Sequence, residues 1–319
     1  VGQARRDVRR GAAQHLRHLH ARRLNLPAGR LPGRVDRGRI AENLRLGVLQ
    51  NRQHLRRNRS CCVVIEVVHA KPAILILAMR CLTLLTDFGT RDHFVGVMKG
   101  VIAGIAPRAT VIDICHEVAP YQINQARFLL NHSYPWFPKG TIHVCVVDPG
   151  VGSARRPLLV EAAGHLFVGP DNGLFSDLLA LPRAKARHLS NAKLYLNNIS
   201  QTFHGRDIFA PVGAHLATGV SPAKAGKLIH DATRIGTGAP LRVGRRYWQG
   251  EVAHIDRFGN LITNLVAAEF LALAPKRIEL KIGLTAVRRL VNSYSEAPEG
   301  EPVLITGSCN TLEVVIQQD

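Results

Sequence analysis

The feature that most constrains the fold is an alternation of strand-like and helix-like segments between residues 81 and 147. Aliphatic and β-branched runs at Cys81–Thr86, Thr110–Cys115 and residues 141–147 are typical of buried strands. Between them, residues 91–105 and 122–134 carry apolar side chains at helical spacing. Because strands that alternate with helices form a parallel sheet covered by crossover helices, we expect an α/β domain with a mostly parallel sheet.

Acidic side chains follow two of these strands directly. Asp87 follows the first strand, and Asp148 follows the third, just before the turn Pro149-Gly-Val-Gly152. In open α/β sheets the carboxyl ends of parallel strands meet at one edge, where ligands bind. Arg155 lies seven residues after Asp148, so a carboxylate and a guanidinium frame a Gly-rich turn. These residues alone fit a ligand site and a salt-bridged loop equally well.

The pattern changes near Arg245, where short alternating segments separated by turn residues begin. Evenly spaced short strands predict a small antiparallel β-barrel domain. We place a boundary near residues 235–244, in the run Gly236-Thr-Gly-Ala-Pro240. The predicted organisation is an Arg-rich extension over residues 1–78, an α/β catalytic domain over 79–240 and a β-barrel domain over 241–319.

The extension over residues 1–78 holds most of the net positive charge. It carries 17 Lys and Arg against 4 Asp and Glu, whereas the rest of the chain carries 25 against 19. Met79 is the first methionine and comes just before the first predicted strand. We interpret residues 1–78 as a non-native or disordered extension, for example from a misplaced start. The alternatives are a targeting peptide or a basic arm, and nucleic acid is an expected partner only if that arm is native.

The spacing of the cysteines and the length of the apolar runs indicate the cellular compartment, metal binding and membrane association. The six cysteines include no CxxC pair and none has a histidine at metal-ligand spacing, so we predict no metal site. Several lie in strand-like runs, where reduced thiols and a cytoplasmic setting fit best. The apolar runs at residues 61–68 and 73–79 are far shorter than the roughly 20 residues that span a bilayer, so no membrane partner is expected.

Five motifs from Met79 onward together resemble one family, the S-adenosylmethionine hydrolases (adenosine-forming), or SAM hydroxide adenosyltransferases (DUF62), which are related to the fluorinase and chlorinase. The motifs are Leu85-Thr-Asp-Phe-Gly-Thr90, Val146-Val-Asp-Pro-Gly-Val-Gly152 with Arg155, Gly169-Pro-Asp-Asn-Gly173, Phe203-His-Gly-Arg-Asp207 and Asp256-Arg-Phe-Gly-Asn-Leu261. Each motif alone is weakly specific, but five in the family's order and spacing are specific. Residues 1–78 have no counterpart in the family.

The resemblance implies a Rossmann-like N-terminal domain and a C-terminal β-barrel domain. It also implies a homotrimer whose active site lies between the first domain of one subunit and the second domain of its neighbour. It implies that water or hydroxide attacks the 5′ carbon of S-adenosyl-L-methionine, releasing adenosine and L-methionine without a cofactor. The family's catalytic triad matches Asp148, Arg155 and His204. Arg155 would stabilise developing hydroxide, and either Asp148 or His204 would accept the proton.

The resemblance also implies a set of substrate-binding residues. Asp87 matches the carboxylate that holds the ribose hydroxyls, Tyr121 an aromatic residue packed on the substrate, and Tyr294 one that stacks on adenine. From their own sequence context, the two tyrosines fit ordinary core aromatics at least as well. The remaining implied binding residues, in the C-terminal domain, are Asp256, Phe258, Asn260, Ser308 and Glu313.

Two alternative functions stay open. The halogenase pattern has hydroxyl-bearing residues at the positions of Asp148, Val151 and Gly205, and this chain has none of the three. A carboxylate at position 148 would repel a halide, so hydrolysis is the favoured reaction. The chain also stops at Asp319, shortly after Leu312-Glu313, where the family usually continues into an adenine-contacting tail. A non-catalytic adenosine-binding module is therefore the second alternative.

Overall fold

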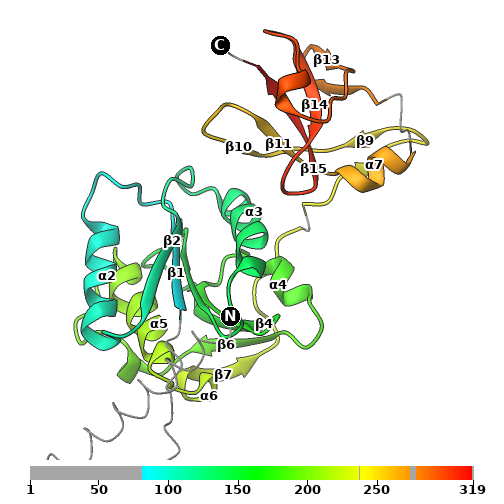
Figure 1. The fold of residues 1–319 in the computed structure, drawn as a ribbon. Helices are drawn as coiled ribbons and strands as arrows, with labels where there is room; N and C mark the ends of the chain where they lie inside the picture. The colour runs from blue at the N-terminus through cyan, green and yellow to red at the C-terminus, as the bar shows by residue number, and fades with distance from the viewer. Residues whose placement is uncertain (1–80, 237, 274–277, 318–319) are drawn as a thin grey trace, which may run out of the picture. The chain divides into compact units, whose positions relative to one another are not determined.

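The computed structural model describes residues 81–236, 238–273 and 278–317 (Figure 1). The predictions for residues 1–78 lie outside the described part of the chain. Among the described residues, no helix combines the length and the apolar character that crossing a membrane requires.

A seven-stranded sheet forms the α/β part of the chain. Its strands are β1 (Cys81–Thr86), β2 (Thr110–Cys115), β3 (Ile142–Val146), β4 (Pro157–Ala162), β5 (His165–Pro170), β6 (Lys185–Leu189) and β7 (Gly226–Ile229). The spatial order is β2-β1-β3-β5-β4-β6-β7. The first four pair in parallel and the other pairings are antiparallel, so five strands run in one direction and β4 and β7 in the other. The predicted α/β class with a mostly parallel sheet is confirmed.

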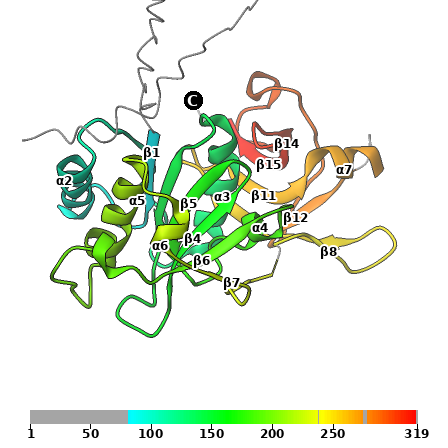
Figure 2. The same cartoon turned by 90° about the horizontal axis from the view of Figure 1, so that it is seen from below.

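Helices cover both faces of this sheet (Figures 1 and 2). Helices α2 (Phe94–Ile105) and α5 (Ala210–Ala217) lie on one face, and α3 (Ile123–Ser133) and α4 (Ser176–Ala180) lie on the other. Alternate residues of β3 enter the two hydrophobic cores: Val144 joins the core under α2 and α5, and Cys145 the core under α3 and α4. Burial on both faces explains why β1 and β3 have continuous apolar sequences instead of alternating ones.

Two strands and one irregular turn were not predicted. Strand β6 pairs antiparallel with both β4 and β7, and β7 is the edge strand; their sequences Lys185-Ala-Arg-His-Leu189 and Gly226-Lys-Leu-Ile229 mix basic and apolar residues. A π-helical turn, Gly205–Phe209, directly precedes helix α5. Short helices complete this part of the chain: Tyr134–Trp136, Ala192–Leu194 and α6 (Pro222–Ala225).

The C-terminal part is antiparallel, as predicted, but its described strands form separate sheets. Its elements are β8 (Leu241–Arg242), β9 (Trp248–Gln249), β10 (Val252–Ile255), β11 (Leu261–Val266), α7 (Ala267–Leu273), β12 (Leu280–Ile282), β13 (Thr285–Val287), Tyr294–Glu296, β14 (Pro302–Thr306) and β15 (Thr311–Ile316). One sheet has the order β10-β11-β15-β14, while β12 pairs with β13 and β8 with β9. Over the described residues these ladders do not close into a barrel, because β10 and β14 end the four-stranded sheet. Helix α7 was not predicted.

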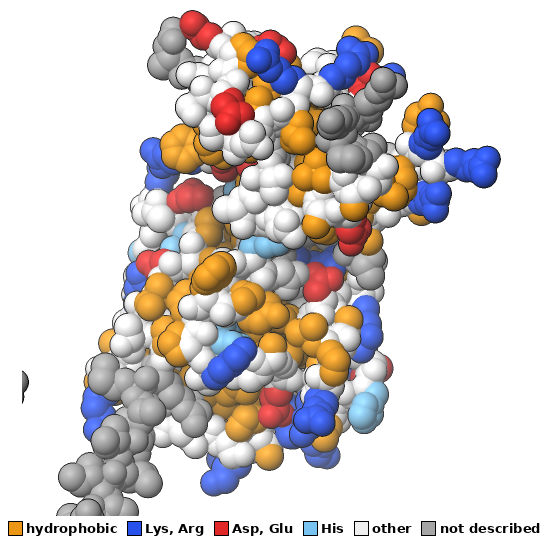
Figure 3. Space-filling model, turned by 45° about the vertical axis from the view of Figure 1, so that its right-hand side comes forward, with side chains coloured by type: hydrophobic (Ala, Val, Ile, Leu, Met, Phe, Trp, Pro, Cys, Tyr) orange, Lys and Arg blue, Asp and Glu red, His pale blue; other side chains and the backbone are white. Residues whose placement is uncertain are grey.

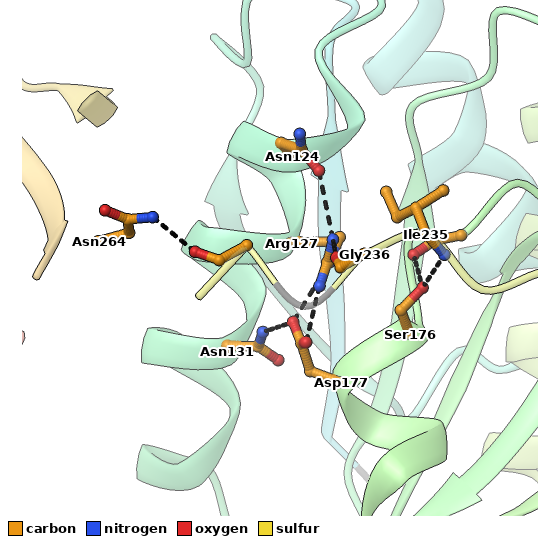
Figure 4. A network of polar contacts seen from close by, with 10 residues as sticks. Asn124, Arg127, Asn131, Ser176, Asp177, Ile235, Gly236 and Asn264 are labelled. Atoms are coloured by element: carbon orange, nitrogen blue, oxygen red, sulfur yellow. Dashed lines mark hydrogen bonds and ion pairs between the residues drawn. The ribbon is translucent and has the colours of Figure 1, made fainter. Parts of the chain in front are cut away.

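The segment after β7 is fastened to the α/β part by a buried polar network (Figure 4). The Arg127 guanidinium donates from Nε and Nη2 to the Asp177 carboxylate, at 3.2 and 2.7 Å, and from Nη1 to the Gly236 carbonyl at 2.8 Å. Asn124 also accepts a bond from Nη1, at 3.3 Å. Nearby, the Ile235 amide donates to the Ser176 hydroxyl at 2.9 Å. All three guanidinium nitrogens of this buried arginine therefore have acceptors.

Charged side chains of both signs occur on the described surface. On the face drawn in Figure 3, hydrophobic side chains gather in the lower middle, and Lys and Arg lie mainly towards its edges. A continuous stripe of basic side chains would be expected of a surface that binds a phosphate backbone. The basic side chains on this face form no such stripe.

Candidate active site

The carboxyl ends of β1 and β3 bring Asp87 and Asp148 to one sheet edge. The two strands pair in parallel with Thr86 opposite Val146, and each acidic residue follows within two positions. Burial raises the pKa of Asp87, and the nearby negative charge of Asp148 raises it further. The predicted meeting of the two carboxylates at this edge is confirmed.

Asp87 also holds the loop that carries Tyr121. Its Oδ2 accepts the backbone N–H of Tyr121 at 2.9 Å, a bond that opposes the raised pKa of the carboxyl. Tyr121 has a backbone φ of 66° and its side chain is 69 % exposed. Tyr121 is therefore not a core aromatic but an exposed ring beside the predicted ribose-binding carboxylate.

The Gly-rich turn after Asp148 packs against the chain that leads to His204. Gly152 has φ 77°, and a Cβ there would lie 2.5 Å from the carbonyl oxygen of Gln201. Only glycine combines this backbone conformation with so close an approach. The turn therefore brings Arg155 next to a segment about 50 residues further along the chain.

Asp148, Arg155 and His204 meet in one hydrogen-bonded group. The Arg155 Nε donates to Asp148 Oδ1 at 2.9 Å, and its Nη2 donates to Asp148 Oδ2. Nη2 also lies 2.8 Å from Nδ1 of His204. The side chains of Arg155 and Asp148 are only 8 % and 5 % exposed, so this is a buried, bidentate ion pair. The structure thus brings the predicted triad together.

One guanidinium nitrogen of Arg155, Nη1, is buried and has no hydrogen-bond acceptor among the described residues. The guanidinium carbon lies 5.2 Å from the centre of the Phe209 ring, which supports one side of the group. Because a buried donor without an acceptor is costly, Nη1 is a position where a polar ligand atom would be stabilised.

His204 is held in a neutral state beside this arginine. Burial and the Arg155 charge lower the pKa of His204 below its usual value, while Asp148, Asp207 and a backbone hydrogen bond to Ser200 act in the opposite direction. His204 immediately precedes the π-helical turn Gly205–Phe209. Such irregular turns are frequent at functional sites because they redirect side chains.

The position that would carry a halide-binding serine is tightly packed. A Cβ on Gly205 would lie 3.2 Å from atoms of Met98, Phe203 and Phe88. A larger residue would need several neighbours to move. Val151, the second halogenase position, is 37 % exposed and carries no hydroxyl.

Three predicted residues of the C-terminal part form one turn between β10 and β11. Asp256 Oδ1 accepts the backbone N–H groups of Phe258 and Asn260, both at 2.9 Å, and its Oδ2 accepts the Asn260 side chain at 2.8 Å. The Asp256 carboxylate thus stabilises the turn through three hydrogen bonds. The Asn260 side chain is buried. The Phe258 ring is 81 % exposed.

Glu313 lies close to this turn. Its side chain is buried on β15, and burial together with Asp256 raises the pKa of its carboxyl. Glu313 and Asp256 also contribute to the raised pKa of Tyr294, whose main cause is burial. The Tyr294 side chain is still 53 % exposed, and Ser308 lies exposed in the turn before β15. The structure therefore groups the C-terminal candidates with one another.

Sequence reasoning missed the residues that support the triad. Phe209 packs on Arg155, and the buried Asp207 carboxylate accepts the backbone N–H of Ser200 at 2.8 Å. Asp207 belongs to a quoted motif, so its position was visible, but its contact with Ser200 was not. No group of three or more His, Cys, Asp and Glu side chains in the described ranges is arranged to hold a metal ion.

Comparison with known proteins supports the same family. The models for the SAM hydroxide adenosyltransferase N-terminal and C-terminal domains match residues 82–226 and 250–319. A Thermus thermophilus protein named (R)-S-adenosyl-L-methionine hydrolase is 38% identical over 252 residues, which are 75% of this chain and 93% of the relative. One from Salinispora arenicola with the same name is 40% identical over 236 residues, covering 72% and 88%.

More distant relatives and solved structures agree. A fluorinase from an Actinoplanes species is 26% identical over 258 residues, covering 70% of this chain and 86% of the relative. The crystal structure of an uncharacterized conserved protein from Thermotoga maritima superposes with a TM-score of 0.69 at 33% identity, covering 74% of this chain and 92% of that one. Since the two family models cover more than half of its residues, the chain belongs to the SAM hydroxide adenosyltransferase family.

Proposed function

We propose that this protein is an enzyme that hydrolyses S-adenosyl-L-methionine to adenosine and L-methionine. The observation that carries the proposal is the buried ion pair of Asp148 and Arg155, in which Arg155 Nη1 has no acceptor among the described residues. A donor and a carboxylate held side by side can bind one water molecule, donate to its oxygen and accept its proton. The curated relatives named as hydrolases support this activity.

In the proposed reaction the water oxygen forms a bond to the 5′ carbon while the bond from that carbon to sulfur breaks. Sulfur keeps the electron pair, so methionine leaves as a neutral thioether and no general acid is required. Nη1 of Arg155 stabilises the oxygen as negative charge develops. Proton acceptance by a positioned base of this kind contributes about 10²–10⁴-fold to rate.

Asp148 is the proposed proton acceptor. Its two oxygens each accept one N–H from Arg155, so each retains a lone pair for water. The Nδ1 of His204 already faces an Arg155 N–H, and the pKa of His204 is lowered. The role of His204 is then to hold Arg155 Nη2, while Asp87 is placed to accept the ribose hydroxyls.

The substrate is the epimer named in the relatives, (R)-S-adenosyl-L-methionine. Because the prefix L already describes the α-carbon, (R) refers to the sulfonium centre. The configuration at sulfur decides where the methionine chain points while the 5′ carbon stays in place. A site with a fixed nucleophile and a separate methionine pocket therefore favours one epimer.

A second copy of the chain is proposed to complete the site, in a homotrimer. The exposed rings of Tyr121, Phe258 and Tyr294 support this, because aromatic side chains are enriched in protein–protein interfaces. If the site spans two copies, mixing Asp148→Asn and Tyr294→Ala proteins should restore activity above either alone. No recovery, or the sedimentation mass of a single chain, would contradict the trimer.

A reducing, cytoplasmic setting is part of the proposal. Cys81, Cys115, Cys145 and Cys309 are free thiols in the structure, and burial raises the pKa of the Cys145 thiol, which keeps it protonated. Free, protected thiols of this kind are usual in reducing compartments.

The decisive experiment incubates the purified protein with each sulfonium epimer in halide-free buffer and follows adenosine by chromatography. We expect adenosine from the (R) epimer, with the 5′ oxygen labelled when the reaction runs in oxygen-18 water. The Asp148→Asn variant is the matched control. Absence of adenosine above that control would refute the hydrolase, and binding without turnover would favour the adenosine-binding module.

A further inference from the structure

We propose that Asp171 and Asn172 are positioning residues that hold the two ends of the loop 148–155, whose first and last residues form the buried ion pair. The proposal rests on the hydrolase function, because it explains how that ion pair keeps its place relative to the substrate. Both residues belong to the motif Gly169-Pro-Asp-Asn-Gly173, to which the proposed reaction itself gives no role.

The loop 148–155 makes its internal hydrogen bonds with itself. The Val151 N–H donates to the Asp148 carbonyl at 3.3 Å, and the Ser153 N–H and hydroxyl both donate to the Gly150 carbonyl, at 3.1 and 2.6 Å. The ion pair likewise joins the first residue of the loop to the last. Where the loop lies on the sheet therefore depends on contacts made from outside it.

Asn172 holds the peptide group that precedes Asp148. Strand β3 ends at Val146, so the carbonyl of the buried Val147 comes after the last residue of the strand and needs another partner. Asn172 Nδ2 donates to this carbonyl at 2.8 Å, and its Oδ1 accepts the Leu174 backbone N–H at 3.2 Å. The Val147 C=O and the Asp148 N–H belong to one peptide group, so this bond fixes the backbone orientation at Asp148.

Asp171 holds Arg156, the residue that follows the loop. The Asp171 backbone N–H donates to the Arg156 carbonyl at 2.9 Å, and Asp171 Oδ2 accepts Nε of Arg156, also at 2.9 Å. Asp171 Oδ1 accepts the Thr233 backbone N–H at 2.7 Å, and the Asp171 side chain is only 3 % exposed. Arg156 is thus bound through both its backbone and its side chain to a residue that is itself fixed.

Both positioning residues come from one short turn at the end of β5, so they hold the ends of the loop at a fixed separation. The chain here runs tightly against β3, since a Cβ on Gly169 would lie 2.3 Å from the Cys145 carbonyl oxygen. A misplacement of about 1 Å can lower the rate of a catalysed reaction about 100-fold. Holding the loop from one turn therefore protects the alignment of the proposed base and its arginine.

The first test is Asn172→Asp, which keeps the size of the side chain. A carboxylate oxygen replaces Nδ2 and faces the Val147 carbonyl, so two acceptors repel each other, while the Leu174 N–H keeps its acceptor. We expect kcat per folded protein to fall about 10–100-fold. KM should change by less than about threefold, because the proposed ribose contact is made by Asp87, which follows β1.

Asn191 provides a matched control, because its side chain makes the same two bonds in the segment after β6. Its Nδ2 donates to the Lys224 carbonyl at 2.8 Å, and its Oδ1 accepts the Lys193 backbone N–H at 3.2 Å. Asn191→Asp introduces the same repulsion, yet kcat should change by less than about twofold. Equal losses of kcat in Asn172→Asp and Asn191→Asp, with folded fractions measured by circular dichroism, would overturn the proposal.

A spectroscopic measurement tests the position of the ion pair without turnover. The Arg155 Nε–H donates to Asp148, so its nitrogen-15 and proton resonance reports the pair, and Arg155→Lys identifies that resonance. We expect it to shift or broaden in Asn172→Asp and to stay unchanged in Asn191→Asp. An unchanged resonance or an unchanged kcat in a folded Asn172→Asp protein would overturn the proposal. If the wild-type protein makes no adenosine, the hydrolase function fails, but the resonances can still be compared.

Asp171→Asn tests the other end of the loop. Asp231→Ala is its control, because it removes only an exposed partner of Arg156. We expect kcat to fall in Asp171→Asn alone, and equal effects of the two variants would contradict the role of Asp171.

The wild-type protein decides the question if neither variant of the turn folds. Backbone order parameters for residues 148–155 should then match those of β3, near about 0.85, and values below about 0.6 would overturn the proposal.

Discussion

Two buried arginines in the α/β part of this protein, Arg127 and Arg155, each pair with an aspartate, and their hydrogen bonds differ in one respect. Arg127 and Asp177 form a pair in which every guanidinium nitrogen has an acceptor. Arg155 and Asp148 form a pair of similar geometry, but Nη1 of Arg155 has no acceptor among the described residues, and His204 holds Nη2.

The difference indicates what each pair is for. All three guanidinium nitrogens of Arg127 have acceptors, and these bonds join α3, α4 and the segment after β7 (Figure 4). A guanidinium with one free, buried donor retains the capacity to bind a ligand atom. Burial and ion pairing alone therefore do not distinguish the two arginines, whereas the hydrogen-bond partners of their nitrogens do.

The largest expected effect is on catalysis at the Arg155–Asp148 pair, called here the incomplete pair because Arg155 Nη1 has no acceptor among the described residues; Arg127–Asp177 is the complete pair. Asp148→Asn removes the proposed proton acceptor without changing the side-chain volume, so kcat for adenosine formation should fall about 10²–10⁴-fold. The equivalent change at the complete pair, Asp177→Asn, should alter kcat by less than about threefold. Initial rates for the two purified variants test this. Equal losses would show that the two pairs do not differ in function.

The next effect is on stability at the complete pair. Asp177→Ala leaves Arg127, whose side chain is 5 % exposed, without its carboxylate, and the free energy of unfolding should fall by about 3 kcal/mol. Urea unfolding measures the change. The control is Asp231→Ala, which removes a 76 % exposed carboxylate from Arg156 and should cost less than about 1 kcal/mol. Equal effects of the two variants would contradict the structural role of Arg127.

A buried pair of histidines, His143 and His165, adds a pH-dependent case to the comparison. Nδ1 of His143 lies 2.7 Å from the Thr83 hydroxyl and its Nε2 lies 3.3 Å from His165 Nδ1, and burial together with His165 lowers the pKa of His143 to about 3. The unfolded chain binds a proton near pH 6.5 and the folded chain does not, so stability falls as the pH drops from 6.5 towards 3.

At pH 4.5 this histidine should reduce the free energy of unfolding by roughly 2–3 kcal/mol relative to neutral pH. Urea unfolding at both pH values measures the loss, and His143→Gln should make it smaller. A variant with the same pH dependence as the wild type would show that other groups control acid unfolding.

The smallest expected effect is a loss of stability from adding a side chain at Gly205, next to His204. Gly205→Ser places a Cβ 3.2 Å from Met98, Phe203 and Phe88 and should lower stability by about 1–2 kcal/mol through overpacking. It should also fail to yield any 5′-halogenated adenosine with added chloride or fluoride, because Asp148 still repels the halide. Chromatography and thermal unfolding test both points. A halogenated product would revive the halogenase alternative.

Several features of the site could be predicted from sequence because they depend on local patterns. The alternation of strands and helices places Asp87 and Asp148 after parallel neighbours, and the parallel register then brings them together. The C-terminal segments could be recognised as strands from their alternation, but whether they close into a barrel depends on pairing between distant segments. Strands β6 and β7 have mixed sequences because β6 is only partly buried and β7, the edge strand, has no fully buried residue.

The amino-acid sequence by itself determined the α/β class and the family, and it predicted the triad, because periodicity and short motifs are properties of neighbouring residues. Only the tertiary structure decided which buried arginine keeps a free donor and which nitrogen of His204 faces it. Both depend on side chains separated by 49 or 50 positions meeting within hydrogen-bond distance. Sequence spacing does not encode such meetings, since they arise from how the helices and loops pack on the sheet.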